Sequence, residues 1–324
     1  MTVREVVCKS ALTRTGIPGA RYALNPYTGC AHACVYCYAS FMTRFSGHTD
    51  RWGTWVDAKV NIADVLEKEI RRKSARRRKS EKLTQPSLAG LGESAKPASH
   101  ESRRSPGLAE SPEEPATPDS LDSAGRPTVL LSSVTDPYQP VEASLCLTRA
   151  CLKALANAAN PLAPEVSILT KSALVARDIP ILRDLPGCEV GMTITALDDA
   201  LARQIEPGAS APSTRLKALE QLASQSIKTW VFISPVLPHY GDSPAALAAV
   251  MKRAREAGVS RIGVDRLNLY PAAMAGLARI SRPEAVQALR AYKSSPQEYL
   301  ARLRSSVSEA AAAADMGIPV QVFF

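Results

Sequence analysis

Three cysteines lie within eight positions near the start of the chain, in the segment NPYTGCAHACVYCYAS (25–40). Cys34 and Cys37 have the spacing of a knuckle that turns two sulfur atoms toward one metal, and Cys30 lies four positions earlier. A zinc site would need a fourth ligand, usually from a second Cys or His pair, and the sequence has no second pair. Thiolates also hold iron–sulfur clusters, and a cubane held by three of them keeps one iron open to an exchangeable ligand.

The remaining cysteines are scattered along the 324 residues, at Cys8, Cys146, Cys151 and Cys188. Such a distribution is typical of free thiols in a reducing compartment and not of a disulfide scaffold. The first residues, MTVREVVCKS, carry charges where a signal peptide needs an apolar run. No stretch approaches the roughly 18 apolar residues of a membrane span. We therefore expect a cytoplasmic protein without a membrane partner.

The formal charge of +9 is concentrated in one run, RRKSARRRKSEK (71–82), which has eight Lys or Arg and one Glu. Subtracting its local charge of +7 leaves +2 for the rest of the chain. The run has two interpretations: a solvated helix end with a disordered arm, or a basic arm that binds phosphates nonspecifically.

Strand-like and helical patterns alternate over most of the chain, which predicts parallel strands joined by right-handed crossovers in a barrel or a doubly wound sheet. The expected strands are 128–133, 165–170, 189–195, 228–234 and 259–264. The expected helices are 61–72, 144–159, 172–184, 212–226 and 244–257.

Four parts follow from this pattern: an N-terminal segment with the cysteine cluster (1–72), an insertion (73–126), the remainder of the alternating unit (127–281) and a helical C-terminal extension (282–324). The insertion is rich in Ser, Pro, Glu and Ala without an apolar period, so we expect it to be disordered. The extension ends in the apolar tail IPVQVFF, which we expect to dock on the core.

The pattern Cys30-x3-Cys34-x-Tyr36-Cys37 resembles the signature of radical S-adenosylmethionine enzymes. Further segments resemble, in this order, the spore photoproduct lyase-like branch of that superfamily: SSVTDPYQPVE (132–142), SILTKSALVARD (167–178), TITALDD (193–199) and IEPGASAPSTRLKAL (205–219). The resemblance implies an α/β fold, a partial (β/α)6 TIM-like barrel, and two cofactors, a [4Fe-4S] cluster and S-adenosyl-L-methionine. The three cysteines would ligate three irons, and the amino and carboxylate groups of S-adenosylmethionine would chelate the fourth.

The resemblance also implies contacts from particular residues to S-adenosylmethionine. Tyr36 would lie by the adenine, although an aromatic residue here is also typical of a core. Thr135 and Asp136 match the branch's contact to the methionyl amino group, which suits a carboxylate because charge-assisted hydrogen bonds are strong. Asp-Pro and Gln-Pro also favour a turn, so a purely structural role for this segment stays open.

Lys171, which follows the expected strand 165–170, would contact the methionyl carboxylate. Thr193, and after it Thr195, match hydroxyl contacts to the ribose, although threonine is also a good strand residue. Glu206 and Arg215 match a further pattern of the branch, but an ion pair that ties a loop to a helix explains them equally well. Active sites of parallel α/β barrels form at the carboxyl ends of the strands, where these residues are expected.

One position departs from the branch. Spore photoproduct lyase uses a cysteine two residues before the Ser-Asp contact as hydrogen donor, and this chain has Ser133 there. An O–H bond is much harder to homolyse than an S–H bond, so repair of spore photoproduct by the same route is not expected. Cys146 and Cys151 lie in an expected helix and are interpreted as buried structural thiols. Tyr138 and Tyr270 are interpreted as packing residues and not as radical relays.

The resulting hypothesis is a radical S-adenosylmethionine enzyme that generates a 5′-deoxyadenosyl radical for hydrogen abstraction. The branch favours DNA or RNA as the substrate, with a peptide or a small molecule as the alternative, and it implies a reducing donor such as flavodoxin or ferredoxin. A hypothesis from another class is a noncatalytic zinc-knuckle protein whose basic run binds nucleic acid. The sequence does not identify a catalytic residue, and fold and cofactor do not settle the substrate.

Overall fold

The computed structural model of the chain describes residues 1–84, 127–157 and 164–324. Its centre is an eight-stranded sheet with the strand order β11-β10-β9-β8-β7-β6-β3-β2. These strands are β2 (Leu12–Arg14), β3 (Tyr22–Leu24), β6 (Thr128–Leu131), β7 (Glu165–Thr170), β8 (Glu189–Thr193), β9 (Lys228–Val236), β10 (Arg261–Arg266) and β11 (Val320–Val322). All neighbouring pairs from β3 to β11 are parallel, and β2 pairs antiparallel with β3.

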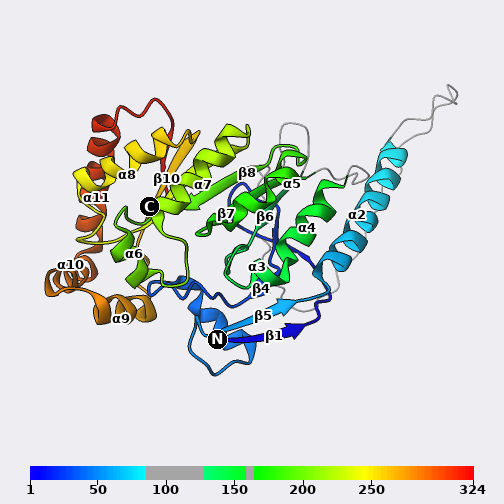
Figure 1. The fold of residues 1–324 in the computed structure, drawn as a ribbon, viewed down its shortest axis with the longest axis horizontal. Helices are drawn as coiled ribbons and strands as arrows, with labels where there is room; N and C mark the ends of the chain where they lie inside the picture. Colours follow the sequence, from blue (N-terminus) through cyan, green and yellow to red (C-terminus); the bar gives the residue numbers. More distant parts are fainter. Residues whose placement is uncertain (85–126, 158–163) are drawn as a thin grey trace, which may run out of the picture.

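Six parallel strands, β3 and β6 to β10, are neighbours in chain order, and a helix follows each of them, which is the partial (β/α)6 barrel that the sequence predicted. The helices are α1 (Thr43–Ser46), α2 (Ile62–Thr84), α3 (Glu142–Leu145), α4 (Leu147–Ala156), α5 (Ile179–Arg183), α6 (Asp199–Ile205), α7 (Pro212–Ser224), α8 (Pro244–Glu256), α9 (Pro271–Ile280), α10 (Pro283–Ser294) and α11 (Pro296–Ala313). In Figure 1, α2 and α4 lie at one end of the sheet and α8 and α11 at the other. Over the described ranges, no helix has the length and apolar character needed to cross a membrane.

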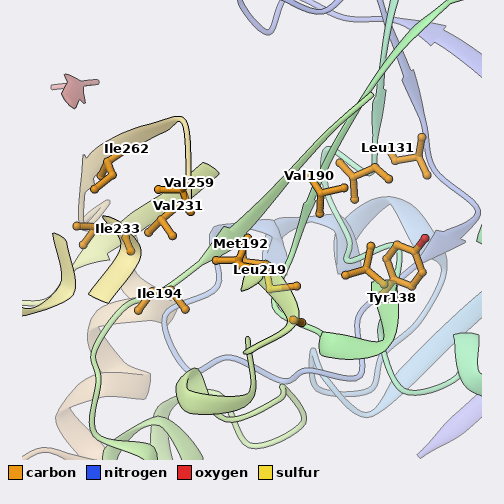
Figure 2. Close-up of a cluster of buried hydrophobic side chains, with 14 of the residues drawn as sticks. Leu131, Tyr138, Val190, Met192, Ile194, Leu219, Val231, Ile233, Val259 and Ile262 are labelled. Carbon is orange, nitrogen blue, oxygen red and sulfur yellow. The ribbon is translucent and has the colours of Figure 1, made fainter. Parts of the chain in front are cut away.

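The main core lies between the outer face of the sheet and the helices. Successive side chains of a strand point to opposite faces, so Val190 and Met192 of β8 point to the same side as Val231 and Ile233 of β9. Figure 2 shows these side chains in one cluster with Leu219 from α7. Burial of this apolar surface is the main driving force for folding, and the alternation keeps the other face of each strand available for a site.

A second, smaller sheet takes its strands from both sides of the cysteines in the sequence. It consists of β1 (Thr2–Val6), β5 (Trp55–Lys59) and β4 (Tyr27–Thr28), with β1 parallel and β4 antiparallel to β5. Tyr27 and Val56 are fully buried in a separate small core of this sheet. Because β4 ends two residues before Cys30, this sheet positions the start of the cysteine loop.

Three expected elements differ in detail from the structure. The helix expected over 61–72 continues to Thr84, so residues 73–84, assigned to the disordered insertion, are helical; Arg, Lys, Glu and Ala are good helix formers. The rest of that segment, 85–126, lies outside the described residues. The helix expected over 144–159 is divided at Cys146, which has the left-handed φ of 53°. The expected helix 172–184 begins as a 3-10 helix, η3 (Ala173–Asp178).

The apolar tail docks on the core, as the sequence predicted, by adding β11 to the edge of the sheet beside β10. The ring of Phe323 lies edge-to-face on Phe232 of β9, with 5.7 Å between the ring centroids. The C-terminal extension therefore contributes a strand to the barrel sheet as well as helices α10 and α11.

Replacing Gly191 by alanine tests the packing of the inner face. A Cβ at Gly191 would lie 2.3–2.6 Å from ring atoms of Trp230, and such overpacking costs about 1–3 kcal/mol. We expect Gly191→Ala to lower the free energy of unfolding by this amount in urea denaturation. The control is Gly16→Ala, because a Cβ at Gly16 meets no atom within 4 Å. Equal stability of the two variants would contradict the described position of Trp230.

Candidate functional site

The three cysteines lie on a loop that forms two successive turns. The backbone N–H of Ala33 donates to the carbonyl of Cys30 (3.3 Å), and that of Cys37 donates to the carbonyl of Cys34 (3.1 Å). All three thiols are free. They line one cavity of about 140 Å³, and the chain then continues into the 3-10 helix η1 (Tyr38–Met42).

Residues that follow neighbouring strands complete the wall of this cavity. The segment after β6 contributes Thr135 and Asp136, the residue after β7 is Lys171, and β8 ends in Thr193. The carboxyl ends of parallel strands meet at one edge of a barrel, which is why positions far apart in the sequence converge. The structure thus brings together all the site residues expected from the sequence except Tyr36 and Thr195.

Thr135 and Gln139 hold the backbone of the cysteine loop. The hydroxyl of Thr135 donates to the carbonyl of Gly29, and the side-chain amide of Gln139 donates to the same oxygen at 3.3 Å. The amide oxygen of Gln139 accepts from the N–H of Ala31 at 2.8 Å. The segment TDPYQP therefore has the structural role that the sequence left open, and Thr135 and Asp136 still line the cavity.

Asp136 is a buried carboxylate surrounded by donors. Oδ1 accepts from the hydroxyl of Thr170 (2.6 Å), and Oδ2 accepts from the backbone N–H of Lys171 (2.8 Å). His32 Nε2 lies 3.2 Å from Oδ2. Burial alone would raise the pKa of Asp136, but His32 and the hydrogen bonds outweigh it and lower the pKa to about 2. This side chain therefore carries a fixed negative charge in the cavity at neutral pH.

Lys171 carries the opposite charge. Within the described residues its ammonium makes no ion pair, and it lies 5.9 Å from the centre of the Tyr36 ring. Burial lowers the pKa of Lys171, but the fields of Cys34 and Glu206 outweigh burial and raise it. The cavity therefore contains two charged groups. The ammonium of Lys171 has no ion-pair partner among the described residues, and the carboxylate of Asp136 already accepts hydrogen bonds.

Tyr36 lies behind the cavity in a buried network. Its hydroxyl donates to Oε1 of Glu206 and lies 3.2 Å from the hydroxyl of Thr195, which also contacts Glu206 (2.9 Å). Glu206 and Arg215 form a fully buried ion pair. Arg215 Nη1 donates to the carbonyl of Thr193 at 2.8 Å. The ion pair that the sequence offered as one interpretation is thus present, and it connects the cysteine loop to the end of β8.

His32 makes a second connection between this loop and the segment after α6. Its Nδ1 lies 2.8 Å from the carbonyl oxygen of Gly208, so this nitrogen carries the proton, because a carbonyl oxygen only accepts. The N–H of Gly208 donates back to the carbonyl of His32 at 3.0 Å. His32 therefore acts as a hydrogen-bonding group that joins the cysteine loop to the segment after α6.

The thiols are chemically suited to a soft metal cluster. Burial raises the pKa of Cys30 to about 12 and also raises the pKa values of Cys34 and Cys37, so all three carry protons that metal binding would displace. The hydroxyl of Ser132 in the cavity wall is buried without a hydrogen-bond partner. Among the described residues, no three His, Cys, Asp or Glu side chains converge on a single metal ion. A cubane does not require that convergence, since each thiolate would bind a different iron.

Several cavity residues were not expected from the sequence. Tyr38 follows the last cysteine, and its hydroxyl donates to the carbonyl of Ser133. Trp52 lines the cavity from the loop before β5, and its indole N–H is buried without a hydrogen-bond partner in the described chain. The position of Tyr38 directly after Cys37 in the sequence could have indicated that Tyr38 lines the cavity. Nothing in the sequence around Trp52 indicates that its loop folds back on the cysteines.

The remaining candidates lie in different surroundings. Ser133 lines the cavity at the position where the branch has its cysteine. Cys151 is fully buried in α4, and Cys146 lies between α3 and α4. Tyr138 is buried and donates to Asp178 Oδ2 at 3.1 Å, whereas Tyr270 is 50% exposed at the start of α9. None of these two cysteines and two tyrosines is part of the wall of the described cavity.

Comparisons with solved structures define the class of fold. The chain is similar to spore photoproduct lyase complexed with dinucleoside spore photoproduct (TM-score 0.60, 14% identity, 99% of this chain and 82% of that chain). It is also similar to a mutant of that lyase with bound AdoMet and dinucleoside spore photoproduct (TM-score 0.61, 15% identity, 100% and 82%). The chain therefore has the fold of spore photoproduct lyase.

Sequence comparison defines the family more narrowly. The uncharacterized protein MJ0683 of Methanocaldococcus jannaschii is 31% identical over 239 residues, which are 74% of this chain and 69% of that protein, and this chain belongs to the same family. The uncharacterized protein Rv2578c of Mycobacterium tuberculosis is 30% identical over 280 residues, 83% of this chain and 66% of that protein. No family model matches the chain.

The Glu206–Arg215 pair supports a prediction on stability. Replacing Arg215 by methionine leaves a buried, unpaired carboxylate, so we expect a loss of about 3–5 kcal/mol in the free energy of unfolding at pH 7. Arg203→Met, a substitution on the exposed side of α6, should change the free energy of unfolding by less than about 0.5 kcal/mol.

The stability of Arg215→Met relative to wild type should depend on pH. Burial alone would raise the pKa of Glu206, but Arg215 and Lys171 outweigh it and lower the pKa below the ordinary 4.5. The stability that this carboxylate contributes is therefore present above pH 4.5 and is lost as the pH falls. The difference in urea stability between wild type and Arg215→Met should narrow on acidification. A constant difference from pH 7 to pH 4 would contradict the ion pair.

Proposed function

We propose that this protein is a radical S-adenosylmethionine enzyme, in which Cys30, Cys34 and Cys37 hold a [4Fe-4S] cluster. The observation that carries the proposal is the meeting of three free thiols and the ammonium of Lys171, which makes no ion pair within the described residues, in one cavity. When bound, the cluster supplies the electron that cleaves the sulfonium of S-adenosylmethionine into methionine and a 5′-deoxyadenosyl radical, which abstracts hydrogen from the substrate.

The charges of the cavity fit the amino-acid end of S-adenosylmethionine. Lys171 offers a cation for the methionyl carboxylate, and such charge-assisted contacts are about twice as strong as neutral hydrogen bonds. Asp136 supplies negative charge for the amino group, and Thr193 supplies a hydroxyl for the ribose. Thr135 orients Gly29 at the start of the loop. Tyr36 orients the loop through Glu206 from behind the cavity, and its contact with adenine stays a prediction from the resemblance.

Exclusion of water is the second contribution of the chain. Cys30 and His32 on the cysteine side of the cavity are buried, and Trp52 lines the same wall. A reactive carbon radical requires that water be kept away, because water and stray donors would otherwise compete with the substrate. The one-electron donor, such as flavodoxin or ferredoxin, belongs to the proposal, and a nucleic-acid substrate stays a prediction from the resemblance.

The cluster is tested by anaerobic purification. We expect a brown protein with iron and sulfide that releases 5′-deoxyadenosine from S-adenosylmethionine after reduction. Cys34→Ala should lose both colour and release, because it removes one of three ligands. Cys146→Ala should keep both, because Cys146 is outside the cavity. A colourless wild-type protein with stoichiometric zinc and no sulfide would favour the zinc-knuckle hypothesis instead.

Lys171→Gln separates cofactor binding from cluster binding. The variant keeps a polar side chain but loses the charge, so the iron and sulfide content should be unchanged. The Kd for S-adenosylmethionine should rise about 10–100-fold, since hydrogen bonds to charged groups contribute about 1.5–3 kcal/mol. Lys153→Gln, exposed on α4, is the matched control. An unchanged Kd in isothermal titration calorimetry would remove Lys171 from the proposed site.

A further inference from the structure

A second and larger cavity, of about 1020 Å³, follows the inner face of the barrel. Its wall includes Ile17–Ala20 before β3, Gln225–Ile227 before β9 and Lys228 at the start of β9, so it reaches the amino ends of the strands. Leu169 of β7 lines both this cavity and the cysteine cavity, which makes the two cavities neighbours. Pockets for small molecules measure about 300–1,000 Å³, so the space suits a ligand of that size.

Aromatic rings form one wall of this larger cavity. Trp230 and Phe232 come from β9, and Phe323 comes from the C-terminal tail beside β11. The ring centroids are 5.6 Å apart for Trp230 and Phe232 and 5.7 Å apart for Phe232 and Phe323. Gly263 of β10 makes room for them, because a Cβ there would lie about 3 Å from both phenylalanine rings (2.9 and 3.0 Å). Flat, apolar surfaces of this kind pack against planar or apolar groups.

Three charged residues of the cavity wall are paired with one another, and Arg183 is an exposed cation of the same wall. Arg261 donates to Glu189 Oε1 at 2.8 Å while it lies 4.0 Å over the Trp230 ring, and Lys228 lies 4.0 Å from Glu189 Oε2. Asp265 is different: in the described chain it accepts a hydrogen bond from the N–H of Arg266 (2.8 Å) and makes no ion pair. Burial raises the pKa of Asp265 by more than the backbone hydrogen bond and the charge of Arg266 lower it.

Asp265 lies at the end of the sheet that carries the cysteine cavity. Thr193 is paired in register with Phe232, and Phe232 is paired with Gly263 on the next strand. Asp265 follows Gly263 by two residues, on the same face of β10 and toward its carboxyl end. The carboxylate is therefore positioned to hold one end of a ligand while the aromatic wall covers the rest.

We propose that this cavity is the substrate site and that it binds a small organic cation, an ammonium or amidinium compound with a planar or apolar body. Asp265 would pair with the cationic nitrogen, and Phe232 and Phe323 would contact the body. An anionic ligand would meet the uncompensated charge of Asp265. The assignment of this ligand as substrate rests on the proposed radical chemistry, whereas its binding does not.

Benzamidine, with its neutral and anionic counterparts benzamide and benzoate, tests this proposal by titration calorimetry on the full chain without S-adenosylmethionine. We expect benzamidine to bind more tightly than benzamide and benzoate not to bind. Asp265→Asn should raise the Kd for benzamidine by about tenfold or more and leave that for benzamide unchanged. Asp50→Asn, at an exposed position, should change neither. Equal binding of benzamidine to wild type and Asp265→Asn, or tight binding of benzoate, would overturn the proposal.

A second variant protects the test against a folding defect. Phe323→Ala should weaken benzamidine and benzamide alike, because it removes part of the wall and no charge; unchanged binding of both would overturn the aromatic contact. Agmatine and a nine-residue peptide with a central arginine should then be tested as competitors of benzamidine. Competition by agmatine alone would indicate that the ligand is a free cation, and competition by the peptide would indicate that it is a peptide side chain. If benzamidine binds through Asp265 but no 5′-deoxyadenosine forms, the proposed function fails and the cation site stands. If 5′-deoxyadenosine forms without this binding, only the cation site fails.

Discussion

The buried ion pair between Glu206 and Arg215 is the constraint on which the position of the cysteine loop depends. Glu206 accepts from Tyr36, which lies between Cys34 and Cys37, and Arg215 donates to the carbonyl of Thr193 at the end of β8. The side chains of Glu206 and Arg215 therefore fix how far Cys34 and Cys37 lie from the end of β8. Burying two charges costs desolvation energy, so the benefit of this arrangement is geometric: a loop of small residues acquires one defined position.

The same loop is held from other strand ends by neutral groups. Gln139 bonds Gly29 and Ala31, and His32 bonds Gly208 in both directions. The loop thus receives contacts from the segments after β6 and after α6 as well as from β8. A site held within a fraction of an ångström needs such supporting contacts.

The sequence alone predicted the elements with a clear hydrophobic periodicity and the site residues that directly follow those elements. The expected strand 165–170 coincides with β7, and Lys171 after it lies in the cavity. The short strands before residue 60 were not expected, because β3 and β4 have three and two residues and β1 has mostly exposed side chains. Such strands are specified by their partners and not by local pattern. Trp52 and Asp265 were missed for the same reason: their importance comes from what folds against them.

The basic run 71–82 and the proposed reactive site lie in different parts of the molecule. The basic run 71–82, which accounts for +7 of the net +9, lies in α2, and Figure 1 shows this helix extending away from the sheet on the side opposite α9, α10 and α11. Beyond about 10 Å, salt screens the field of such a run. The charges of Asp265 and Glu189 on the inner face come from β10 and β8 instead. Attraction of a polyanion to α2 and selection of a reacting group inside the barrel are consequently independent properties, and an affinity for nucleic acid would not by itself identify the molecule that reacts.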